Sequence, residues 1–239
     1  MDEGTDVMPV AIITGASKGL GRALAEALAA RGWDLVLDAR GGDALAAVAR
    51  AVAGHGARVE GLPGDVTDAG HRAELVAAAG RLGGLDLLVH NASALGAEPL
   101  VPLAGLALDG LRRALEVNVV AALGLVQEAL PLLRASEAGA VIAVSSDAAA
   151  EAYETWGGYG ASKAALDQLA AVLGAEEPGL RVWAVDPGDM ATELYAAAVP
   201  DDHGARPDPA EVAPAFLRLL DERPATGRYA APSLLEGRR

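Results

Sequence analysis

Three side chains in the second half of the sequence could together move a proton. Tyr159 and Lys163 are four residues apart, so they share one face if the segment is helical. A phenol titrates near pH ~10 in isolation and a nearby cation favours the phenolate, so we expect Lys163 to lower the pKa of Tyr159. Ser146, a hydroxyl donor, ends an apolar run upstream. Singly these would be ordinary helix or strand-end residues; together they predict acid and base chemistry on a substrate oxygen.

A glycine-rich turn lies near the N-terminus, between an apolar run over residues 10–14 and a helical pattern. The turn reads Gly15-Ala16-Ser17-Lys18-Gly19-Leu20-Gly21. Glycines let a backbone approach a pyrophosphate, and the start of the following helix offers free N–H groups and a partial positive charge. A tight turn alone would explain the glycines, but their place after the first strand of an alternating series favours a dinucleotide site.

Short apolar runs alternate with helical patterns along the chain. The predicted strands are 10–14, 34–39, 57–62, 85–90, 140–145, 181–186 and 227–231. This alternation predicts an α/β fold, a Rossmann-like doubly wound parallel sheet of about seven strands flanked by helices, with ligands at the carboxyl ends of the strands. We expect a flexible tail over residues 1–8 and one domain over 9–239. We also expect a kink at Pro131 in a helix over 117–135, and an irregular, lid-like loop over 195–208.

Composition narrows the function. The 239 residues include 33 acidic and 19 basic side chains, a net charge of −14, which would repel nucleic acid. The absence of cysteine excludes disulfides and thiol chemistry, and the histidines lack metal-ligand spacing, so we expect no metal. The acidic start is unlike a secretory signal, and no uncharged apolar run nears the ~18 residues that span a bilayer. We therefore expect a cytoplasmic enzyme without membrane contacts.

Further motifs follow the glycine turn in a fixed order. They are Asp65-Val66, Asn91-Ala92, Asn118, Ser146 thirteen residues before Tyr159, and Pro187-Gly188 with Met190 and Thr192. With the turn and the Tyr-x-x-x-Lys pair, they make the chain resemble the short-chain dehydrogenase/reductase family over almost its whole length. The chain departs from the family at His90, where asparagine is usual and where we expect a backbone contact, and at Ser93, where glycine is usual.

The resemblance implies hydride transfer between a nicotinamide ring and a small carbonyl or alcohol substrate. Ser146 would hydrogen-bond the substrate oxygen, Tyr159 would exchange its proton, and Lys163 would hold the nicotinamide ribose. Asn118 would keep the neighbouring helix open for a water that relays protons to Lys163. Hydride arrival builds negative charge on oxygen, so a hydroxyl and a proton source lower the barrier. The implied cofactor contacts are Gly15, Ser17, Lys18, Gly19, Leu20, Gly21, Arg40, Asp65, Val66, Asn91, Ala92, Tyr159, Lys163, Pro187, Gly188, Met190 and Thr192.

The end of the second predicted strand bears on the choice of cofactor. An acidic residue about 20 positions after the glycine turn binds the ribose 2′-hydroxyl of NAD(H), whereas an arginine there suits the 2′-phosphate of NADP(H). Ala39 takes the place of the family's NAD-selecting aspartate, and Arg40 could pair with a phosphate. Asp38 would select NAD(H) after a shift of one residue, but we expect its side chain on the opposite strand face from Ala39. With Lys18 as a second cation, NADP(H) is favoured and NAD(H) stays possible.

Substrate contacts are expected from Leu95, residues 153–156, Asp189 and Met190, and the 195–208 segment. A narrower resemblance, over residues 156–159 and 175–182, is to sepiapterin reductases and would imply a dicarbonyl or pterin-like substrate. The alternative is a regulator that binds dinucleotides without catalysis, but the complete set of Asn118, Ser146, Tyr159 and Lys163 argues against it. The family also implies a homodimer or homotetramer built on the helices near Asn118 and Tyr159, although Ala-rich helices serve equally in monomer cores.

Overall fold

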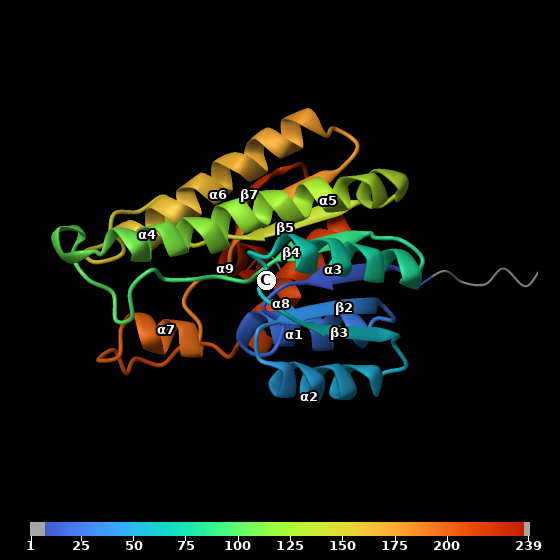
Figure 1. The fold of residues 1–239 in the computed structure, drawn as a ribbon, viewed down its shortest axis with the longest axis horizontal. Coiled ribbons are helices and arrows are strands. Elements are labelled where there is room, and N and C mark those ends of the chain that lie inside the picture. Colours follow the sequence, from blue (N-terminus) through green and yellow to red (C-terminus); the bar gives the residue numbers. More distant parts are fainter. Residues whose placement is uncertain (1–7, 237–239) are drawn as a thin grey trace, which may run out of the picture.

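Seven parallel strands form one sheet in the order β3-β2-β1-β4-β5-β6-β7 (Figure 1). The structure is a computed structural model and describes residues 8–236. The strands are β1 (Val10–Ile13), β2 (Asp34–Ala39), β3 (Val59–Pro63), β4 (Leu87–His90), β5 (Ala140–Val144), β6 (Arg181–Asp186) and β7 (Gly227–Ala230). The predicted single-domain, doubly wound sheet of about seven strands is confirmed. Of the tail expected over residues 1–8, all but Met8 lies outside the described residues.

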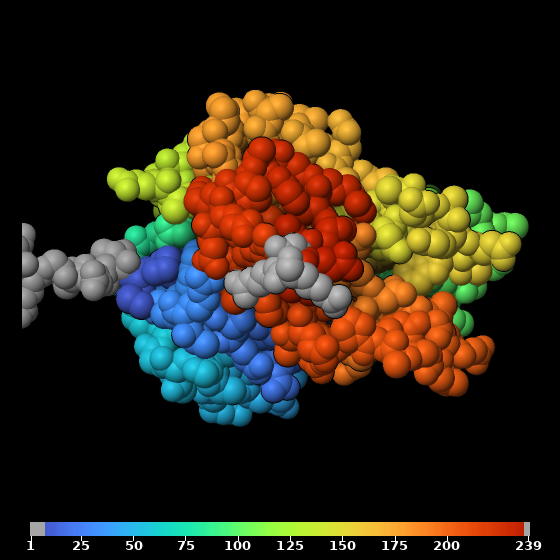
Figure 2. All heavy atoms as spheres, turned by 180° about the vertical axis from the view of Figure 1, so that it is seen from behind, coloured from blue at the N-terminus to red at the C-terminus, as the bar shows by residue number. Residues whose placement is uncertain are grey.

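Helices cover both faces of the sheet. One face carries α3 (Ala69–Leu82), α5 (Ala121–Ala135) and α6 (Gly157–Glu176); the other carries α1 (Gly19–Ala29), α2 (Gly42–Ala53) and α8 (Pro209–Glu222). The remaining helices are α4 (Leu108–Leu115), α7 (Glu193–Ala198), which stands apart from the sheet in Figure 1, and α9 (Ala231–Glu236). From behind, the red C-terminal segment lies beside the blue N-terminal part (Figure 2), which reflects the packing of α8 on α1.

Alternating side chains of the inner strands fill a core on each side of the sheet. In β1, Ala11 and Ile13 join the core beneath α1 and α8, whereas Val10 and Ile12 join the core beneath α3 and α5. Each fully buried isoleucine contributes roughly 1.5–3 kcal/mol to stability. A strand that is buried on both faces reads as a continuous apolar run, which is why its position is plain in the sequence.

Capping residues set the ends of the helices around the sheet. The Asp68 carboxylate accepts the backbone N–H of His71 at 2.7 Å, so α3 begins where the sequence predicts. Gly83, with φ of +120°, ends the same helix, and Gly32, with φ of +81°, follows α1. Both glycines occupy backbone conformations that residues with a side chain rarely adopt.

The strand order reverses between β1 and β4, and this positions the site. From β1 the chain builds outward through β2 and β3, then returns to β4 on the other side of β1. The loops that leave the carboxyl ends of β1 and β4 therefore run in opposite directions and open a crevice between them.

Two predicted segments differ from the structure. The helix expected over 117–135 begins earlier, with α4, and it contains a π-helical turn (Glu116–Val120) before α5. The loop expected over 195–208 is helical at its start, because Thr192 caps α7 by accepting the backbone N–H of Tyr195 at 3.2 Å.

The combined helical stretch Leu108–Ala135 is long and apolar enough to count as a candidate membrane span by length and composition. In the fold, α5 packs onto the sheet through a buried row that includes Leu125, Ala129 and Leu133. The apolar residues of α5 therefore belong to the core of the domain.

Candidate active site

A cavity of about 1050 Å³ lies at the carboxyl ends of the strands. Its walls come from the glycine turn, the ends of β2, β4, β5 and β6, and helix α6. Among the predicted site residues, those that line it are Gly15, Ser17, Lys18, Gly19, Leu20, Arg40, Asp65, Val66, Asn91, Ala92, Ser146, Tyr159, Lys163, Pro187, Gly188, Met190 and Thr192. Gly21 and Asn118 are not lining residues. The fold thus brings nearly all the predicted residues to one place.

The glycine turn is sterically fixed. Gly15 and Gly19 have φ of +65° and +55°. A Cβ on Gly21 would lie 2.5 Å from the carbonyl oxygen of Gly15 and 2.6 Å from Nδ2 of Asn91. α1 begins at Gly19 without a side-chain cap, so the N–H groups of its first turn could bind the phosphates of a dinucleotide.

Thr14 and Asn91 fasten this turn to the end of β4. The hydroxyl of Thr14 accepts the backbone N–H groups of Asn91 and Ala92, each at 3.0 Å. The Asn91 amide donates to the carbonyls of Thr14 at 2.9 Å and Gly15 at 3.2 Å. Because Thr14 is fully buried, these bonds hold Gly15, Asn91 and Ala92 firmly in place on the cavity wall.

Asp38 and Ala39 point to opposite faces of β2, as predicted. Oδ1 of Asp38 lies 2.7 Å from Nε2 of His71 on α3, and its Oδ2 accepts the N–H of Gly15 at 3.5 Å. Ala39 joins the core on the other face. Burial raises the pKa of Asp38. Arg40, exposed at the cavity wall, makes no ion pair with any residue in the range 8–236.

Asp65 is held ionised beside the cavity. Its Oδ1 accepts the N–H and the hydroxyl of Thr67, at 3.0 and 2.8 Å, and its Oδ2 pairs with Arg113 at 2.9 Å. Burial would raise the pKa of Asp65, but these bonds outweigh it and lower that pKa to about 2. The sequence did not indicate Arg113, because this lining residue reaches Asp65 only through the packing of α4.

Lys163 and Tyr159 are both buried, and burial sets their charge states. Nζ of Lys163 donates to the carbonyl oxygen of Val144 at 2.8 Å and lies 5.5 Å from the centroid of the Tyr159 ring. Burial lowers the pKa of Lys163 to about 8. Burial also raises the pKa of Tyr159 to about 12, although the hydroxyls of Ser93 and Ser146 lower it. The prediction that Lys163 lowers the phenol's pKa is therefore wrong here, because desolvation dominates and leaves a neutral phenol.

Asn118 lies in the π-helical turn and is fully buried. Its Oδ1 accepts the backbone N–H of Ala94 at 2.8 Å, and its Nδ2 donates to the Ala94 carbonyl at 2.9 Å and to the Ser162 hydroxyl at 2.8 Å. The side chain thereby joins the loop after β4 to α6, one residue before Lys163.

His90 ends β4 next to this centre. Burial, and then the charge of Lys163, lower the pKa of His90 to about 3, so its ring is neutral. Neither ring nitrogen makes a hydrogen bond of good geometry among residues 8–236, but the backbone of Val117 acts on the ring and raises its pKa slightly against these two effects, in line with the backbone contact expected from the sequence. In the same range, no group of three or more His, Asp or Glu side chains could hold a metal ion.

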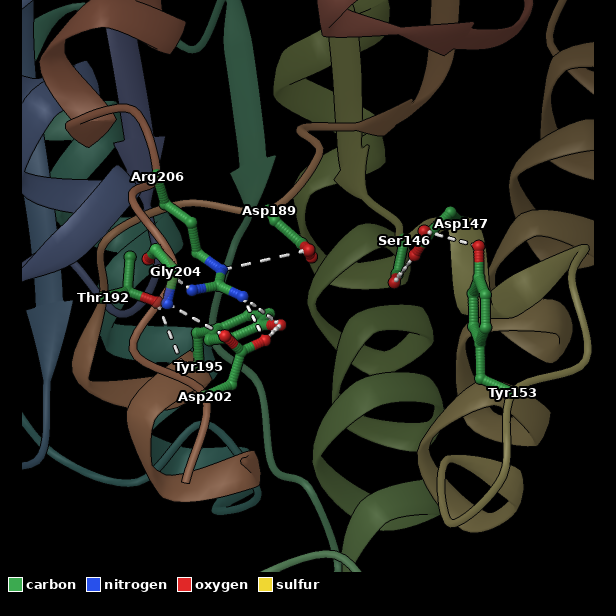
Figure 3. A network of polar contacts seen from close by, with 9 residues as sticks. All are labelled: Ser146, Asp147, Tyr153, Asp189, Thr192, Tyr195, Asp202, Gly204 and Arg206. Atoms are coloured by element: carbon green, nitrogen blue, oxygen red, sulfur yellow. Dashed lines mark hydrogen bonds and ion pairs between the residues drawn. The ribbon is translucent and has the colours of Figure 1, made fainter. Parts of the chain in front are cut away.

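Figure 3 shows two polar clusters, one around Asp147 and one around Arg206. In one, the Tyr153 hydroxyl donates to Asp147 at 3.0 Å, and the Ser146 hydroxyl donates to the same carboxylate at 3.1 Å. In the other, the Arg206 guanidinium lies 3.8 Å from the centroid of the Tyr195 ring and pairs with Asp202.

Of the predicted substrate contacts, Leu95, Trp156, Asp189 and Met190 line the cavity, whereas Tyr153 does not. Arg206 and Asp202 lie in the 195–208 segment, from which substrate contacts were expected, but the sequence did not single out either residue. A positive residue four positions after an acidic one, beside Tyr195, is too common a pattern to single out.

Comparison with known proteins places this chain among dehydrogenases. A family model described as short chain dehydrogenase matches residues 9–203. Cis-4-hydroxycyclohexanecarboxylate dehydrogenase from Sinomonas cyclohexanicum is 36% identical over 224 residues, which cover 87% of this chain and 88% of that protein. A glycine betaine reductase from Emericella nidulans is 37% identical over 188 residues, or 77% of this chain, but the chain spans only 15% of its length.

Solved structures agree. A short chain dehydrogenase from Shigella flexneri complexed with NADP has a TM-score of 0.88 and 28% identity, covering 95% of this chain and 99% of that one. One from Escherichia coli CFT073 complexed with NADPH has a TM-score of 0.87 and 30% identity, covering 95% and 98%. These relatives do not show the narrower resemblance to sepiapterin reductases.

Proposed function

Because the chain belongs to the short-chain dehydrogenase family, we propose that it is an NADP(H)-dependent oxidoreductase that interconverts a carbonyl and a secondary alcohol, with Tyr159 as general acid and base. One observation carries the proposal. Ser146, Tyr159 and Lys163 line the wall of a cavity that also contains the glycine turn. A reacting oxygen and a dinucleotide can therefore share one enclosure.

The residues present fit a dinucleotide phosphate. Close approach at Gly15 and Gly21 leaves no room for side chains in the turn, and the first turn of α1 has uncapped N–H groups. Asp38 is engaged by His71 and Gly15, whereas Arg40 has no ion pair within residues 8–236, which favours a 2′-phosphate over a 2′-hydroxyl. Relatives of the same fold bind NADP or NADPH, which supports this choice over NAD(H). The nicotinamide would supply the hydride.

The chain's own residues would handle the proton. Tyr159 is a neutral phenol across the physiological pH range, so it can donate to an oxygen that gains negative charge. The Ser146 hydroxyl, which donates to Asp147 in this structure, would turn to donate to the same oxygen and hold it beside the phenol. Lys163, fixed by Val144, would bind a ribose hydroxyl with its remaining protons, and Asn118 would position α6 so that Lys163 stays in place.

The further cofactor contacts are proposed from their place on the cavity wall. They are Gly15, Ser17, Lys18, Gly19, Leu20, Asp65, Val66, Asn91, Ala92, Pro187, Gly188, Met190 and Thr192, with Gly21 shaping the turn from behind. The catalytic domain would span residues 9–239 of a cytoplasmic protein.

A homodimer or homotetramer is proposed through α4, α5 and α6. Leu108, Leu123 and Val172 on these helices, and Val120 in the π-helical turn between α4 and α5, are between 40% and 65% exposed. Apolar side chains this exposed on neighbouring helices favour burial against a second copy.

The names of the relatives point to different substrates, a hydroxycyclohexanecarboxylate in one and glycine betaine in another. Reduction of sepiapterin or of simple diketones is a weaker proposal, and absence of activity on both would remove it. A second candidate function, dinucleotide binding without catalysis, would leave the complete set of Asn118, Ser146, Tyr159 and Lys163 without a use.

The test compares wild type with Tyr159→Phe and Tyr229→Phe. Oxidation of NADPH is followed with a panel of aldehydes and ketones, and cofactor binding by thermal shift. General acid catalysis is worth ~10²- to 10⁴-fold, so Tyr159→Phe should lose at least that much turnover while it still binds NADPH. Tyr229, on β7 and bonded to Ala225, is the matched control and should stay active. Near-normal rates in Tyr159→Phe would contradict the catalytic assignment. Cofactor binding without turnover of any carbonyl would favour the regulator.

A further inference from the structure

Charged side chains line both ends of the cavity. Lys18, Arg40 and Arg113 line the part formed by the glycine turn, the end of β2 and α4. Lys18 pairs there with Glu193 and Arg113 pairs with Asp65, whereas Arg40 has no ion pair within residues 8–236. Asp147 and Asp189 line the part that also contains Ser146 and Tyr159. The first set suits the phosphates of a dinucleotide. The second set lies where the proposed function places the substrate, so its charge selects among substrates.

Asp147 is an ordered carboxylate without a cation. Its Oδ1 accepts the Ala148 N–H at 2.8 Å and the Ser146 hydroxyl at 3.1 Å, and its Oδ2 accepts the Tyr153 hydroxyl at 3.0 Å. All three donors are neutral, and no ion pair to Asp147 forms within the described part of the chain. The carboxyl group of Asp147 is therefore held in place one residue from the hydroxyl that would hold the reacting oxygen.

Asp189 adds a second negative charge from a separate loop, the one after β6 (Figure 3). Its ion-pair partner in residues 8–236 is Arg206, at 4.0 Å from Nε, and that guanidinium is bound more closely by Asp202 and Tyr195. Burial raises the pKa of Asp189, and the charge of Asp147 raises it further. Asp147 and Asp189 therefore place two carboxyl groups on the wall of the same end of the cavity.

Aromatic rings complete this end. Trp156, Tyr159 and Tyr195 all line the cavity, with ring centroids 5.6 Å apart for Trp156 and Tyr159 and 6.3 Å apart for Trp156 and Tyr195. The Tyr195 ring is already occupied by a cation, Arg206, stacked at 3.8 Å, so the Trp156 ring is the one offered to a ligand. Aromatic rings beside carboxylates bind ammonium groups well, because a cation is attracted both to the charge and to the ring face. The same wall would repel a carboxylate or phosphate on the substrate.

We propose that the substrate carries a positively charged ammonium group near its reacting carbonyl or alcohol, bound between Asp147, Asp189 and the ring of Trp156. This inference rests on the proposed function for the identity of the substrate end. Such a group would bring one positive charge to a wall that carries two carboxyl groups. The electrostatic gain grows because the site is partly shielded from water.

Three ketones that differ in one group test the charge. They are cyclohexanones with trimethylammonium, tert-butyl or carboxylate at C4; the first two have nearly the same shape. With NADPH, kcat/KM should be at least about tenfold higher for the ammonium ketone than for the tert-butyl ketone, and lowest for the carboxylate. Added salt should reduce the difference, because ions screen the carboxylates.

Variants then locate the effect. Asp147→Asn and Asp189→Asn should each cut the ammonium-to-tert-butyl ratio about three- to tenfold, mainly through KM. Glu137→Gln is the matched control, because this substitution also removes one carboxylate. Glu137 is exposed and precedes β5, at the opposite edge of the sheet from the cavity. Glu137→Gln should leave the ratio unchanged.

Binding is read separately from turnover, by thermal shift of the NADPH complex with each ketone. If no carbonyl compound is reduced but the ammonium ketone still stabilises best, the proposed function fails and the cation site stands. If ketones are reduced but the ammonium compound is no better than the tert-butyl one in either readout, the cation site is wrong and the proposed function stands. An equal fall of the ammonium-to-tert-butyl ratio in Glu137→Gln and Asp147→Asn would also overturn the cation site.

Discussion

Nζ of Lys163 donates a hydrogen bond of 2.8 Å to the carbonyl oxygen of Val144, the last residue of β5. The bond ties α6 to the strand end just before Ser145 and Ser146. It also leaves the ammonium 1% exposed, without a carboxylate bonded to it in the described part of the chain. The buried environment of Lys163 therefore determines both the position of its ammonium group and its charge state.

Activity should depend on the proton of Lys163. Its pKa is about 8, whereas that of Tyr159 is about 12. The rate of carbonyl reduction, as kcat/KM, should therefore fall as pH rises through about 8, when the ammonium loses its proton while the phenol keeps its own. Lys163→Met should be much slower, and its kcat/KM should not show this fall with pH. A profile of wild type that stays flat to pH 9.5 would contradict the assignment.

The titration of Lys163 should also make the free energy of unfolding depend on pH. Burial lowers the pKa of Lys163 from 10.5 to about 8, so between these values the unfolded chain binds more protons than the folded one. The free energy of unfolding should therefore rise with pH across this window, by about 3 kcal/mol relative to Lys163→Met. Urea unfolding of both proteins at pH 7.5 and pH 10.5 measures the difference. An equal pH response of the two proteins would show that Lys163 is not desolvated.

Arg40 should determine the preference for NADPH over NADH. Arg40→Ala should raise KM for NADPH about ten- to hundredfold, because a charge-assisted bond to the 2′-phosphate contributes ~1.5–3 kcal/mol. KM for NADH should change little. Arg50→Ala, an equally charged change in the last turn of α2, is the control. A parallel rise for both cofactors in Arg40→Ala would mean that Arg40 does not read the phosphate.

Much of this site could be predicted because its parts are local in sequence. The glycine turn, the Tyr159–Lys163 spacing and the buried strands each leave a pattern within about ten residues. The sheet then gathers these parts, since parallel strands deliver their carboxyl ends to one edge.

What could not be predicted depends on tertiary contacts. The pairing of Asp65 with Arg113 joins residues 48 positions apart. The pKa of Tyr159 was predicted with the wrong sign, because charge proximity is visible in the sequence and desolvation is not. The low pKa of the His90 ring likewise depends on its burial and on Lys163, which α6 brings next to it.

Gly21 should tolerate no side chain, whereas Gly80 should. A Cβ on Gly21 would lie 2.5 Å from the Gly15 carbonyl oxygen, so Gly21→Ala must displace the glycine turn. We expect at least about tenfold weaker NADPH binding and a lower melting temperature. Gly80, also in a helix interior, has open space at its Cβ position, so Gly80→Ala should gain ~0.5–1 kcal/mol in stability. Fluorescence titration with NADPH and thermal unfolding measure both, and unimpaired NADPH binding by Gly21→Ala would mean that the turn does not hold the cofactor.

Asn118 should act through its three hydrogen bonds. Asn118→Leu keeps the approximate shape but leaves the N–H and carbonyl of Ala94 and the hydroxyl of Ser162 without this partner. Unpaired buried groups cost ~1–3 kcal/mol each, so we expect a loss of several kcal/mol and displacement of Lys163 with at least tenfold lower kcat/KM. Gln127→Leu, an exposed amide on the same helical stretch, should change stability by less than ~0.5 kcal/mol.

Asn118→Asp separates hydrogen bonding from shape. The new carboxylate would be buried against the Ala94 carbonyl, so its pKa should lie above the unfolded value of ~3.9. A protonated carboxyl group can donate to that carbonyl as the amide does, whereas a carboxylate cannot. The stability of Asn118→Asp should therefore be closest to wild type at low pH and should fall as pH rises through the raised pKa. Urea unfolding of both proteins at pH 5 and pH 8 tests this. A gap that is constant or widens on acidification would mean that the donor bond to Ala94 contributes nothing.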